Sequence, residues 1–401
     1  MNVYATIIEQ ATRLTEEVIR LRRDFHKNPE LGFEEKRSSS VIAEYLKNLN
    51  IEVKTGIAKT GIMGLLSGAT PGKTLMLRAD MDALPIHELN DTDYRSTNPG
   101  VMHACGHDGH MAVLLGTAKL LSSMRARIKG QIKFVFQPAE ENLGGAQIMI
   151  EEGILKNPTV DAAFGLHLIS LLPYGYIGCR KGPFMASLDI FTLRILGRAG
   201  HSAMPDGSVD AITLSAEVVL QLQDHIRKSL SADRPIVVNM GTIHGGAAPN
   251  IVADKVEVTG TVRALNETDR SSIKILMEDF LREAITARGG AYELDYVQGY
   301  PVTVNDNAMT DLVMRVAYSI VGRVNVIEIA PSMASEDMSF YLKDVPGCFF
   351  FVGAGSSDPA LNQPHHNPYF ALDERALETG VRMLSTIAVE YLENTWSQLH
   401  P

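Results

Sequence analysis

KTLMLRADMDALP, residues 73–85, places a short apolar run directly before two aspartates, Asp80 and Asp82. The apolar run is typical of a buried strand, and the acidic residues follow at the point where that strand ends. Helix-like and strand-like segments alternate on both sides of this stretch, which predicts an α/β fold with helices covering a sheet. The helical segments are residues 38–49 and 111–124, and the strand-like segments are residues 130–136 and 160–168.

The pattern changes near Pro183, which predicts a second domain. From there the segments follow the order strand, helix, strand, strand, helix, strand, with Ser208 as the expected N-cap of the first helix. This βαββαβ order indicates a compact, ferredoxin-like unit inserted into a larger α/β domain, whose alternating pattern then resumes. We therefore expect one domain of residues 1–183 and 298–401, built on a mixed sheet, and an inserted domain of residues 184–297.

The composition argues against nucleic-acid and membrane partners. The net charge is −10, and we find no basic stretch suited to a phosphate backbone. The most apolar stretch, residues 160–179, is interrupted by His167 and Pro173 and is too short to span a bilayer. The three cysteines are widely spaced, which argues against a disulfide framework. The N-terminus has the pattern of an amphipathic helix rather than a signal peptide, so a reducing cytoplasm is the expected compartment.

Residues 102–110, MHACGHDGH, concentrate one of the three cysteines and three of the twelve histidines of the chain. A disulfide, a thiol nucleophile and a metal site are the alternatives that such a cluster raises. Other polar residues lie near the ends of the predicted strands, namely Glu140, Glu141, His167, His365 and His366. Ligands bind outside the carboxyl ends of the strands in open α/β sheets, so these side chains are expected to converge.

A metal site explains this convergence best. Thiolate, imidazole and carboxylate groups are the usual donors for a zinc-like ion. Asp80 and Asp82 would orient a histidine ligand, because a carboxylate often accepts a hydrogen bond from the ring nitrogen that does not bind the metal. Glu140 and Glu141 are adjacent, so one would bind metal while the other moves a proton. His103 and His110 are expected to be structural rather than ligating.

Seven stretches, in this order, resemble the motifs of the M20 metallopeptidase family: RADMDALP, MHACGHDGH, QPAEENLGGA, GLHL, GRAGHSAMP, GGAAPNIVAD and HHNPYF. They cover nearly the whole chain. The subgroup that they resemble is that of N-acyl-amino-acid amidohydrolases, which includes hippurate hydrolases and plant hydrolases of auxin conjugates. The resemblance implies a zinc-exopeptidase-like catalytic domain that hydrolyses an N-acylated amino acid to a carboxylic acid and a free amino acid.

The resemblance also implies two divalent metal ions in each subunit. Zinc is favoured by the thiolate, and manganese, cobalt and nickel are alternatives. Cys105 takes the metal-bridging place that a carboxylate fills in other branches of the family. His366 is preferred over His365 because the family's ligand stands two residues before a proline, here Pro368. The implied ligand set is Cys105, His107, Glu141, His167 and His366.

Roles for further residues follow from the same resemblance. Glu140 matches the general acid/base and Asp82 the residue that orients a ligand, whereas Asp80 stands where other branches carry a metal-binding histidine. The inserted unit matches a lid that also forms a homodimer. His201 would reach the partner's active site and stabilise the oxyanion. Asn250 and Arg263 resemble lid residues that hold the carboxylate of a small-molecule substrate.

Three alternatives stay open. A thiol hydrolase would use Cys105 as nucleophile with His107 as base, and it would survive a chelator but not an alkylating agent. A non-catalytic binding protein on the same scaffold is disfavoured because the positions of Glu140 and Cys105 both match the family. Within the M20 family, the chain would instead act as a dipeptidase or carboxypeptidase, or as a deacetylase of an N-acetylated biosynthetic intermediate.

Overall fold

The computed structural model describes residues 3–141, 144–230, 234–358 and 362–393. It divides the chain into two compact units, each with its own sheet. The first unit comprises Met1–Gly182, Val304–Ala330 and Phe340–Pro401, and the second comprises Pro183–Thr303 and Pro331–Ser339. The segment Pro331–Ser339 belongs to the second unit although it lies beyond the expected insertion. Within the described ranges, no helix combines the length and the apolar character needed to cross a bilayer.

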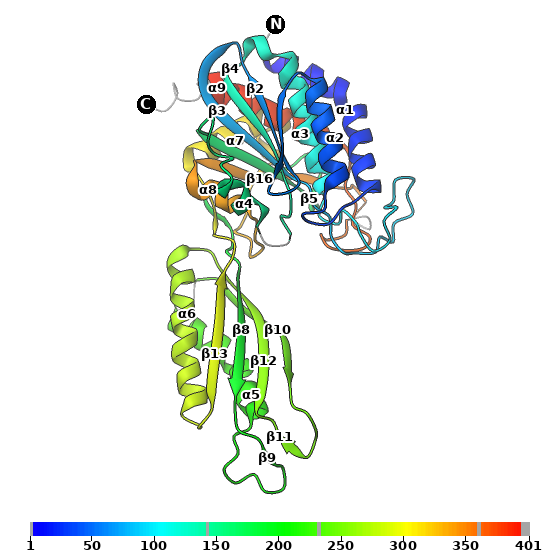
Figure 1. Cartoon of the computed structure of the whole chain (residues 1–401). Coiled ribbons are helices and arrows are strands. Elements are labelled where there is room, and N and C mark those ends of the chain that lie inside the picture. Colours follow the sequence, from blue (N-terminus) through cyan, green and yellow to red (C-terminus); the bar gives the residue numbers. More distant parts are fainter. Residues whose placement is uncertain (1–2, 142–143, 231–233, 359–361, 394–401) are drawn as a thin grey trace. The chain divides into compact units, whose positions relative to one another are not determined.

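The first unit is built on an eight-stranded mixed sheet, which confirms the predicted α/β class (Figure 1). The strands follow the order β1-β2-β4-β3-β5-β16-β6-β15. The central strands β4, β3, β5 and β16 run parallel to one another, whereas β1 and β2 are antiparallel to their neighbours. Parallel strands are covered on both faces, which explains why β16 is buried along its whole length. The bounds are β1 Glu52–Ile57, β2 Gly61–Ser67, β3 Thr70–Asp80, β4 Lys129–Gln137, β5 Ala162–Pro173, β6 Ile177–Cys179, β15 Val326–Glu328 and β16 Gly347–Gly355.

The helices of the first unit bury an apolar stripe against this sheet. Phe25 of α1 and Leu121 of α3 share one core with Leu75 and Leu77, which point to the same side of β3. Met76 points to the other side of β3 and is equally buried, so both faces of the strand are covered. The helices are α1 Val3–Lys27, α2 Lys36–Asn48, α3 His107–Ser123, α4 Gly145–Glu151, α7 Asn307–Val321, α8 Met338–Asp344 and α9 Arg375–Glu393.

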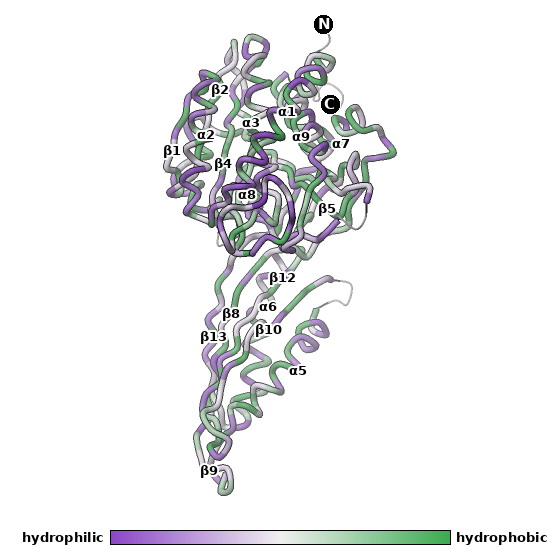
Figure 2. Tube along the Cα trace, turned by 90° about the vertical axis from the view of Figure 1, so that its right-hand side faces the viewer, coloured by the Kyte–Doolittle hydropathy of each residue, from purple (hydrophilic) through white to green (hydrophobic). Residues whose placement is uncertain are grey.

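The second unit has the βαββαβ order that the sequence predicts. Its antiparallel sheet follows the order β10-β12-β8-β13, with helices α5 and α6 packed in the same core (Figures 1 and 2). The N-cap of α5 is Asp210, whose carboxylate accepts the backbone N–H of Ile212. The expected cap, Ser208, instead donates to the carbonyl of Pro205, so that prediction is wrong. The bounds are β8 Asp189–Leu196, β9 Gly200–His201, α5 Ala211–Ser229, β10 Ile236–Gly245, β11 Ile251–Val252, β12 Lys255–Ala264, α6 Glu267–Leu281 and β13 Ala291–Gln298. Two short strands, β7 Gly182–Met185 and β14 Thr303–Asn305, lie where the chain passes from one unit to the other.

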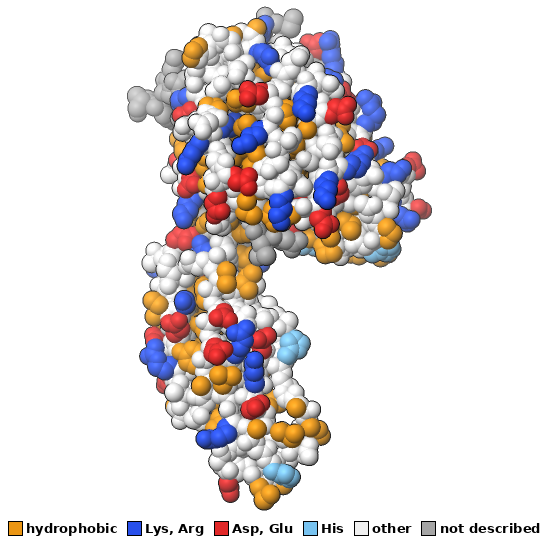
Figure 3. Space-filling view, in the orientation of Figure 1, with side chains coloured by type: hydrophobic (Ala, Val, Ile, Leu, Met, Phe, Trp, Pro, Cys, Tyr) orange, Lys and Arg blue, Asp and Glu red, His pale blue; other side chains and the backbone are white. Residues whose placement is uncertain are grey.

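Charged side chains of both signs are interspersed on the visible face of the first unit (Figure 3). On that face, neither sign gathers into a broad patch.

Candidate metal centre

Asp82, two residues beyond the end of β3, joins three parts of the candidate site. Its Oδ1 and Oδ2 atoms accept the backbone N–H groups of Glu140 and Glu141 at 3.0 and 2.9 Å. Its own backbone carbonyl accepts a hydrogen bond from Nδ1 of His107 at 2.9 Å. Asp82 is 1% exposed, so water does not compete for these bonds. This geometry is that of an orienting group, because both carboxylate oxygens already have protein partners.

Asp80, the last residue of β3, is held by two other side chains. Nη1 of Arg78 donates to Oδ2 at 2.8 Å, and Nδ1 of His110 donates to Oδ1 at 2.6 Å. Burial alone would raise the pKa of Asp80, but His107, His110 and Arg78 hold that pKa well below its usual value. Nε2 of His110 accepts the backbone N–H of Leu168 at 2.9 Å. Both ring nitrogens of His110 are therefore occupied by the protein.

Gly106 places Cys105 and His107 side by side at the start of α3. Its φ of 87° lies in the left-handed region, and a Cβ there would lie 3.2 Å from Cδ1 of Leu372. Glycine alone takes this backbone conformation without strain. The helix begins at His107, earlier than the predicted residues 111–124, so His107 projects from the first helical turn.

Two histidines present the same ring nitrogen to a common space. His107 donates its Nδ1 proton to the carbonyl of Asp82, and His167 donates its Nδ1 proton to the carbonyl of Leu168 at 3.0 Å. Nε2 is therefore the nitrogen that each ring directs into this space. Nε2 of His107 is buried without a hydrogen-bond partner, and Nε2 of His167 lies 3.5 Å from Sγ of Cys105. A buried polar atom left unpaired is costly, so the site fits a bound cation that would take the place of a proton on this nitrogen. His167 lies within β5, which continues to Pro173, beyond the end of the predicted segment 160–168.

The loop before α9 brings His366 to Glu141. His366 has a φ of 64°, and its backbone N–H donates to the carbonyl of Ala104 at 2.8 Å. Its Nε2 lies 3.1 Å from Oε1 of Glu141. The neighbouring His365 instead directs Nε2 to the carbonyl of Leu168 at 3.0 Å. The two adjacent histidines therefore have different partners, and only His366 faces a glutamate of the site.

The donor atoms form overlapping groups in which every pair lies within 4.8 Å. Donors around one zinc ion sit about 2.0–2.3 Å from the metal, hence within about 4 Å of one another. Cys105 belongs to two of these groups, so its sulfur lies close to both sets of donors. The groups that lie wholly within the first unit are Cys105, His107 and His167; Cys105, Glu141 and His366; His107, Glu140 and Glu141; and Asp80, His107 and His110.

The charges in this space favour a cation. Burial raises the pKa of the Cys105 thiol well above its usual value, and the charges of Glu141 and Glu140 raise it further. Burial lowers the pKa of His107, but Asp80, Asp82 and Glu141 together outweigh burial and raise the pKa to about 10. Both groups therefore hold a proton when no cation is present, and a cation binding to Sγ and Nε2 would displace those protons.

A buried ion network behind His107 was not predicted from the sequence. Oδ2 of Asp108 lies 2.7 Å from Nε of Arg22 in an ion pair, and it accepts a hydrogen bond from Nδ1 of His26 at 2.8 Å. Nε2 of His26 lies 3.1 Å from Oε1 of Glu88. All four side chains are almost completely buried. The four residues come from α1, from the loop after β3 and from α3, which are far apart in the sequence. The only sequence signal for the network is therefore Asp108, an acidic residue directly after the ligand candidate His107.

The second unit places two of its three candidate residues together. His201 lies in β9, is exposed, and pairs with Ile251 of β11, which directly follows Asn250. Arg263 lies at the other end of β12, where Nη1 donates to Oγ of Ser335 at 2.6 Å and to the carbonyl of Met333 at 3.1 Å. His201 and Asn250 are thus neighbours, whereas Arg263 is separated from them by the length of β12.

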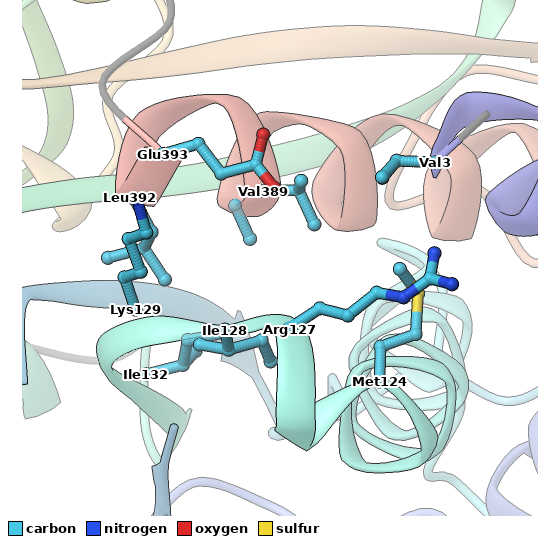
Figure 4. A pocket seen from close by; sticks show the side chains of 10 residues that line it. Val3, Met124, Arg127, Ile128, Lys129, Ile132, Val389, Leu392 and Glu393 are labelled. Carbon is cyan, nitrogen blue, oxygen red and sulfur yellow. The ribbon is translucent and has the colours of Figure 1, made fainter. Parts of the chain in front are cut away.

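An apolar pocket in the first unit lies away from the candidate residues (Figure 4). Val389 and Leu392 of α9 face Met124 and Ile132 across it. Ile132 is near the amino end of β4, whereas Glu140 follows the carboxyl end of that strand. The pocket is therefore separate from the rim that gathers the metal donors.

Comparison with known proteins identifies a family. The sequence pattern of "Peptidase family M20/M25/M40" matches residues 76–390. An N-acyl-L-amino acid amidohydrolase of Geobacillus stearothermophilus is 42% identical over 302 residues, covering 74% of this chain and 81% of the relative. Thermostable carboxypeptidase 2 of Saccharolobus solfataricus is 39% identical over 382 residues, covering 93% and 95% respectively.

A solved structure shows the same fold. The YXEP protein of Bacillus subtilis, described as a dinuclear metal-binding peptidase from the M20 family, superposes with a TM-score of 0.83. It is 32% identical, and the match covers 95% of this chain and 99% of that chain. The comparison and the donor groups together support divalent metal binding.

Proposed function

Because the chain belongs to peptidase family M20/M25/M40, we propose that it hydrolyses the amide bond of N-acyl amino acids to give a carboxylic acid and a free amino acid. As a family member it is a metal-dependent hydrolase that acts on amides. The finer assignment to N-acyl amino acids is supported by the 42% identity to the N-acyl-L-amino acid amidohydrolase. The observation that carries the proposal is the convergence of Cys105, His107 and His167 beside Glu140.

The proposed ligands of two divalent cations are Cys105, His107, Glu141, His167 and His366. Their support is the unpaired Nε2 of His107 and the short Cys105–His167 and Glu141–His366 distances. The thiolate favours zinc, with manganese, cobalt and nickel as alternatives. When bound, such cations would polarise the acyl carbonyl and lower the pKa of the attacking water toward neutrality.

Glu140 is the proposed proton carrier. Its side chain is 6% exposed, and its carboxylate belongs to a donor group with His107 and Glu141. A carboxylate oxygen of Glu140 would accept a proton from the attacking water and then deliver it to the leaving nitrogen. Asp82 keeps this carboxylate in place by binding the backbone N–H of Glu140, and it orients His107 as well.

His201, Asn250 and Arg263 are proposed to act on the substrate. The guanidinium of Arg263 would bind the substrate carboxylate with two parallel hydrogen bonds, aided by the amide of Asn250. His201 would stabilise the oxyanion in the active site of a partner subunit, so the proposed assembly is a homodimer formed through the second unit. His201→Ala should lower kcat about 100- to 1000-fold while metal content stays unchanged. An unchanged kcat would contradict this role.

Surface features of the second unit support the dimer. Leu220 and Ile212 of α5 are 77% and 48% exposed, and large exposed apolar side chains gather at protein interfaces. Among the described residues, β10 pairs with β12 alone, so one edge of this sheet is open to another strand. The proposed compartment is the reducing cytoplasm, because three cysteines spaced widely along the sequence are not the framework typical of secreted proteins.

A substrate panel tests the proposed function. The zinc-loaded protein would be assayed with benzoyl-glycine, N-acetyl amino acids and dipeptides. We expect hydrolysis of the acylated amino acids, loss of activity after chelation, and recovery when zinc is added. Preferred cleavage of dipeptides would instead favour the second candidate, a dipeptidase or carboxypeptidase, which the 39% identity to a carboxypeptidase supports. Activity that survives chelation but not thiol alkylation would favour a thiol hydrolase.

A further inference from the structure

The turn after β4 carries Glu140 and Glu141 in a backbone conformation that must be held in place. Ala139 has a φ of 52°, in the left-handed region that disfavours residues with a Cβ. Ala139 is completely buried, and a Cβ on Gly32 would lie 3.1 Å from its side chain. The backbone N–H of Gly145 donates to the carbonyl of Ala139 at 3.2 Å. Tight packing and specific hydrogen bonds therefore maintain this turn.

Glu35 supplies one of those hydrogen bonds from a distant part of the chain. Its Oε1 accepts the backbone N–H of Ala139 at 3.0 Å, and its Oε2 accepts the hydroxyl of Thr60 at 2.5 Å. Glu35 precedes α2 as its N-cap residue, yet its side chain makes no capping hydrogen bond there. The carboxylate is 0% exposed. The Glu35 carboxylate therefore does not cap its own helix. It is buried at the strained turn, whose conformation it helps to maintain.

Three consecutive backbone N–H groups of the turn are thus bound by two carboxylates. Glu35 holds Ala139, and Asp82 holds Glu140 and Glu141. Asp82 approaches from the end of β3, and Glu35 from the segment before α2. Loss of either carboxylate would free the turn on one side and move the Glu140 and Glu141 side chains.

We propose that Glu35 is a positioning residue, which sets the orientation of the Glu140 and Glu141 carboxylates by clamping the backbone of Ala139. This inference rests on the proposed function, because it takes Glu140 as the proton carrier and Glu141 as a ligand. Glu35 itself does not touch the substrate. A neutral amide oxygen also accepts the N–H of Ala139, so we expect the clamp to require an acceptor rather than a charge.

The test compares Glu35→Ala with Glu35→Gln and uses Glu34→Ala as a matched control, since Glu34 is the exposed neighbour. Each zinc-loaded variant would be assayed for kcat and KM on an N-acyl amino acid. Zinc affinity would be measured separately by competition with a chromogenic chelator. Glu35→Ala should lower kcat and zinc affinity about 10- to 100-fold each, the usual effect of losing a group that orients a metal ligand. KM should change little. Glu35→Gln and Glu34→Ala should stay within about threefold of the native protein.

If Glu35→Ala fails to fold, Thr60→Val is the second variant, because it removes only the hydroxyl that anchors Oε2 of Glu35. It should shift kcat and zinc affinity in the same direction. Native kcat and native zinc affinity in a folded Glu35→Ala or Thr60→Val protein would overturn the inference. A native protein that leaves every acylated amino acid intact while the Glu35→Ala variant loses zinc affinity would refute the proposed substrate class and leave the clamp supported.

Discussion

Sγ of Cys105 lies 3.5 Å from Nε2 of His167, although 62 residues separate the two along the chain. Cys105 precedes α3 and His167 lies in β5, so the contact depends on the parallel sheet that brings these elements to one rim. A thiol and an imidazole lone pair at this separation are suited to share a cation.

The adjacent histidines of the loop before α9 should differ in their effect on metal binding. His366→Ala removes the ring that faces Glu141, so zinc affinity should fall by more than about a hundredfold, beyond the usual effect of a supporting group. His365→Ala removes a ring that faces the carbonyl of Leu168, so it should keep both ions. Metal bound per chain after gel filtration checks the pair, and equal losses in the two variants would contradict the ligand choice.

The adjacent glutamates should separate metal binding from proton transfer. Glu140→Gln should retain metal and lower kcat about 10²- to 10⁴-fold, because an amide cannot carry the proton. Glu141→Gln should lose metal, because it weakens a ligand that also contacts His366. The measurements are metal content and kcat on the same preparations. A Glu140→Gln protein with near-native kcat would show that another group moves the proton.

The buried network behind His107 should contribute strongly to stability. Arg22→Met leaves the buried charge of Asp108 without its main partner, which should reduce the free energy of unfolding by about 3–5 kcal/mol. Arg13→Met is the control, because Arg13 pairs with Glu9 on an exposed face and such pairs contribute less than about 1 kcal/mol. Denaturant unfolding of both variants checks the contrast. A similar small loss in each would show that the network is dispensable.

Glu35 should make stability depend on pH. Burial, with a further contribution from the charge of Asp82, raises the pKa of Glu35 from 4.5 to about 7, although bonds from Thr60 and Ala139 oppose the rise. The folded state therefore binds this proton more tightly than the unfolded state. The resulting stabilisation is present below the unfolded pKa and is lost as pH rises through about 7, a change of about 3 kcal/mol.

Glu35→Gln cannot ionise, so it lacks this decline. Its free energy of unfolding relative to the native protein should therefore rise between about pH 5 and about pH 8.5, measured in the presence of a chelator. A difference between the two proteins that stays constant with pH would contradict a buried, weakly acidic Glu35. Glu34→Ala should follow the native pH profile, because Glu34 is exposed.

The sequence predicted the fold class well because it depends on local patterns. Apolar runs such as residues 130–136 coincide with β4, and the βαββαβ order of the second unit follows from periodicity alone. Boundaries were less accurate. The α3 helix begins at His107 because Gly106 turns the chain there, and α5 is capped by Asp210 because its carboxylate reaches the N–H of Ile212.

The supporting residues Glu35 and Arg22, unlike Asp82, could not be predicted, because their roles depend on contacts across the fold. Glu35 belongs to an acidic pair that resembles a solvated surface, yet its carboxylate is buried against Ala139. Arg22 lies in a charged helix, and only the packing of α1 against α3 reveals its partner Asp108. The strained φ of Ala139 likewise has no local marker, since alanine rarely adopts it.

The central claim is that separated sulfur, nitrogen and oxygen donors hold two cations at one rim of the sheet. Elemental analysis of the purified, zinc-repleted protein, combined with activity on an N-acyl amino acid before and after chelation, tests it most directly. We predict about two zinc ions per chain and activity that disappears and returns with them. A protein that binds less than one ion per chain, yet remains fully active, would contradict the account.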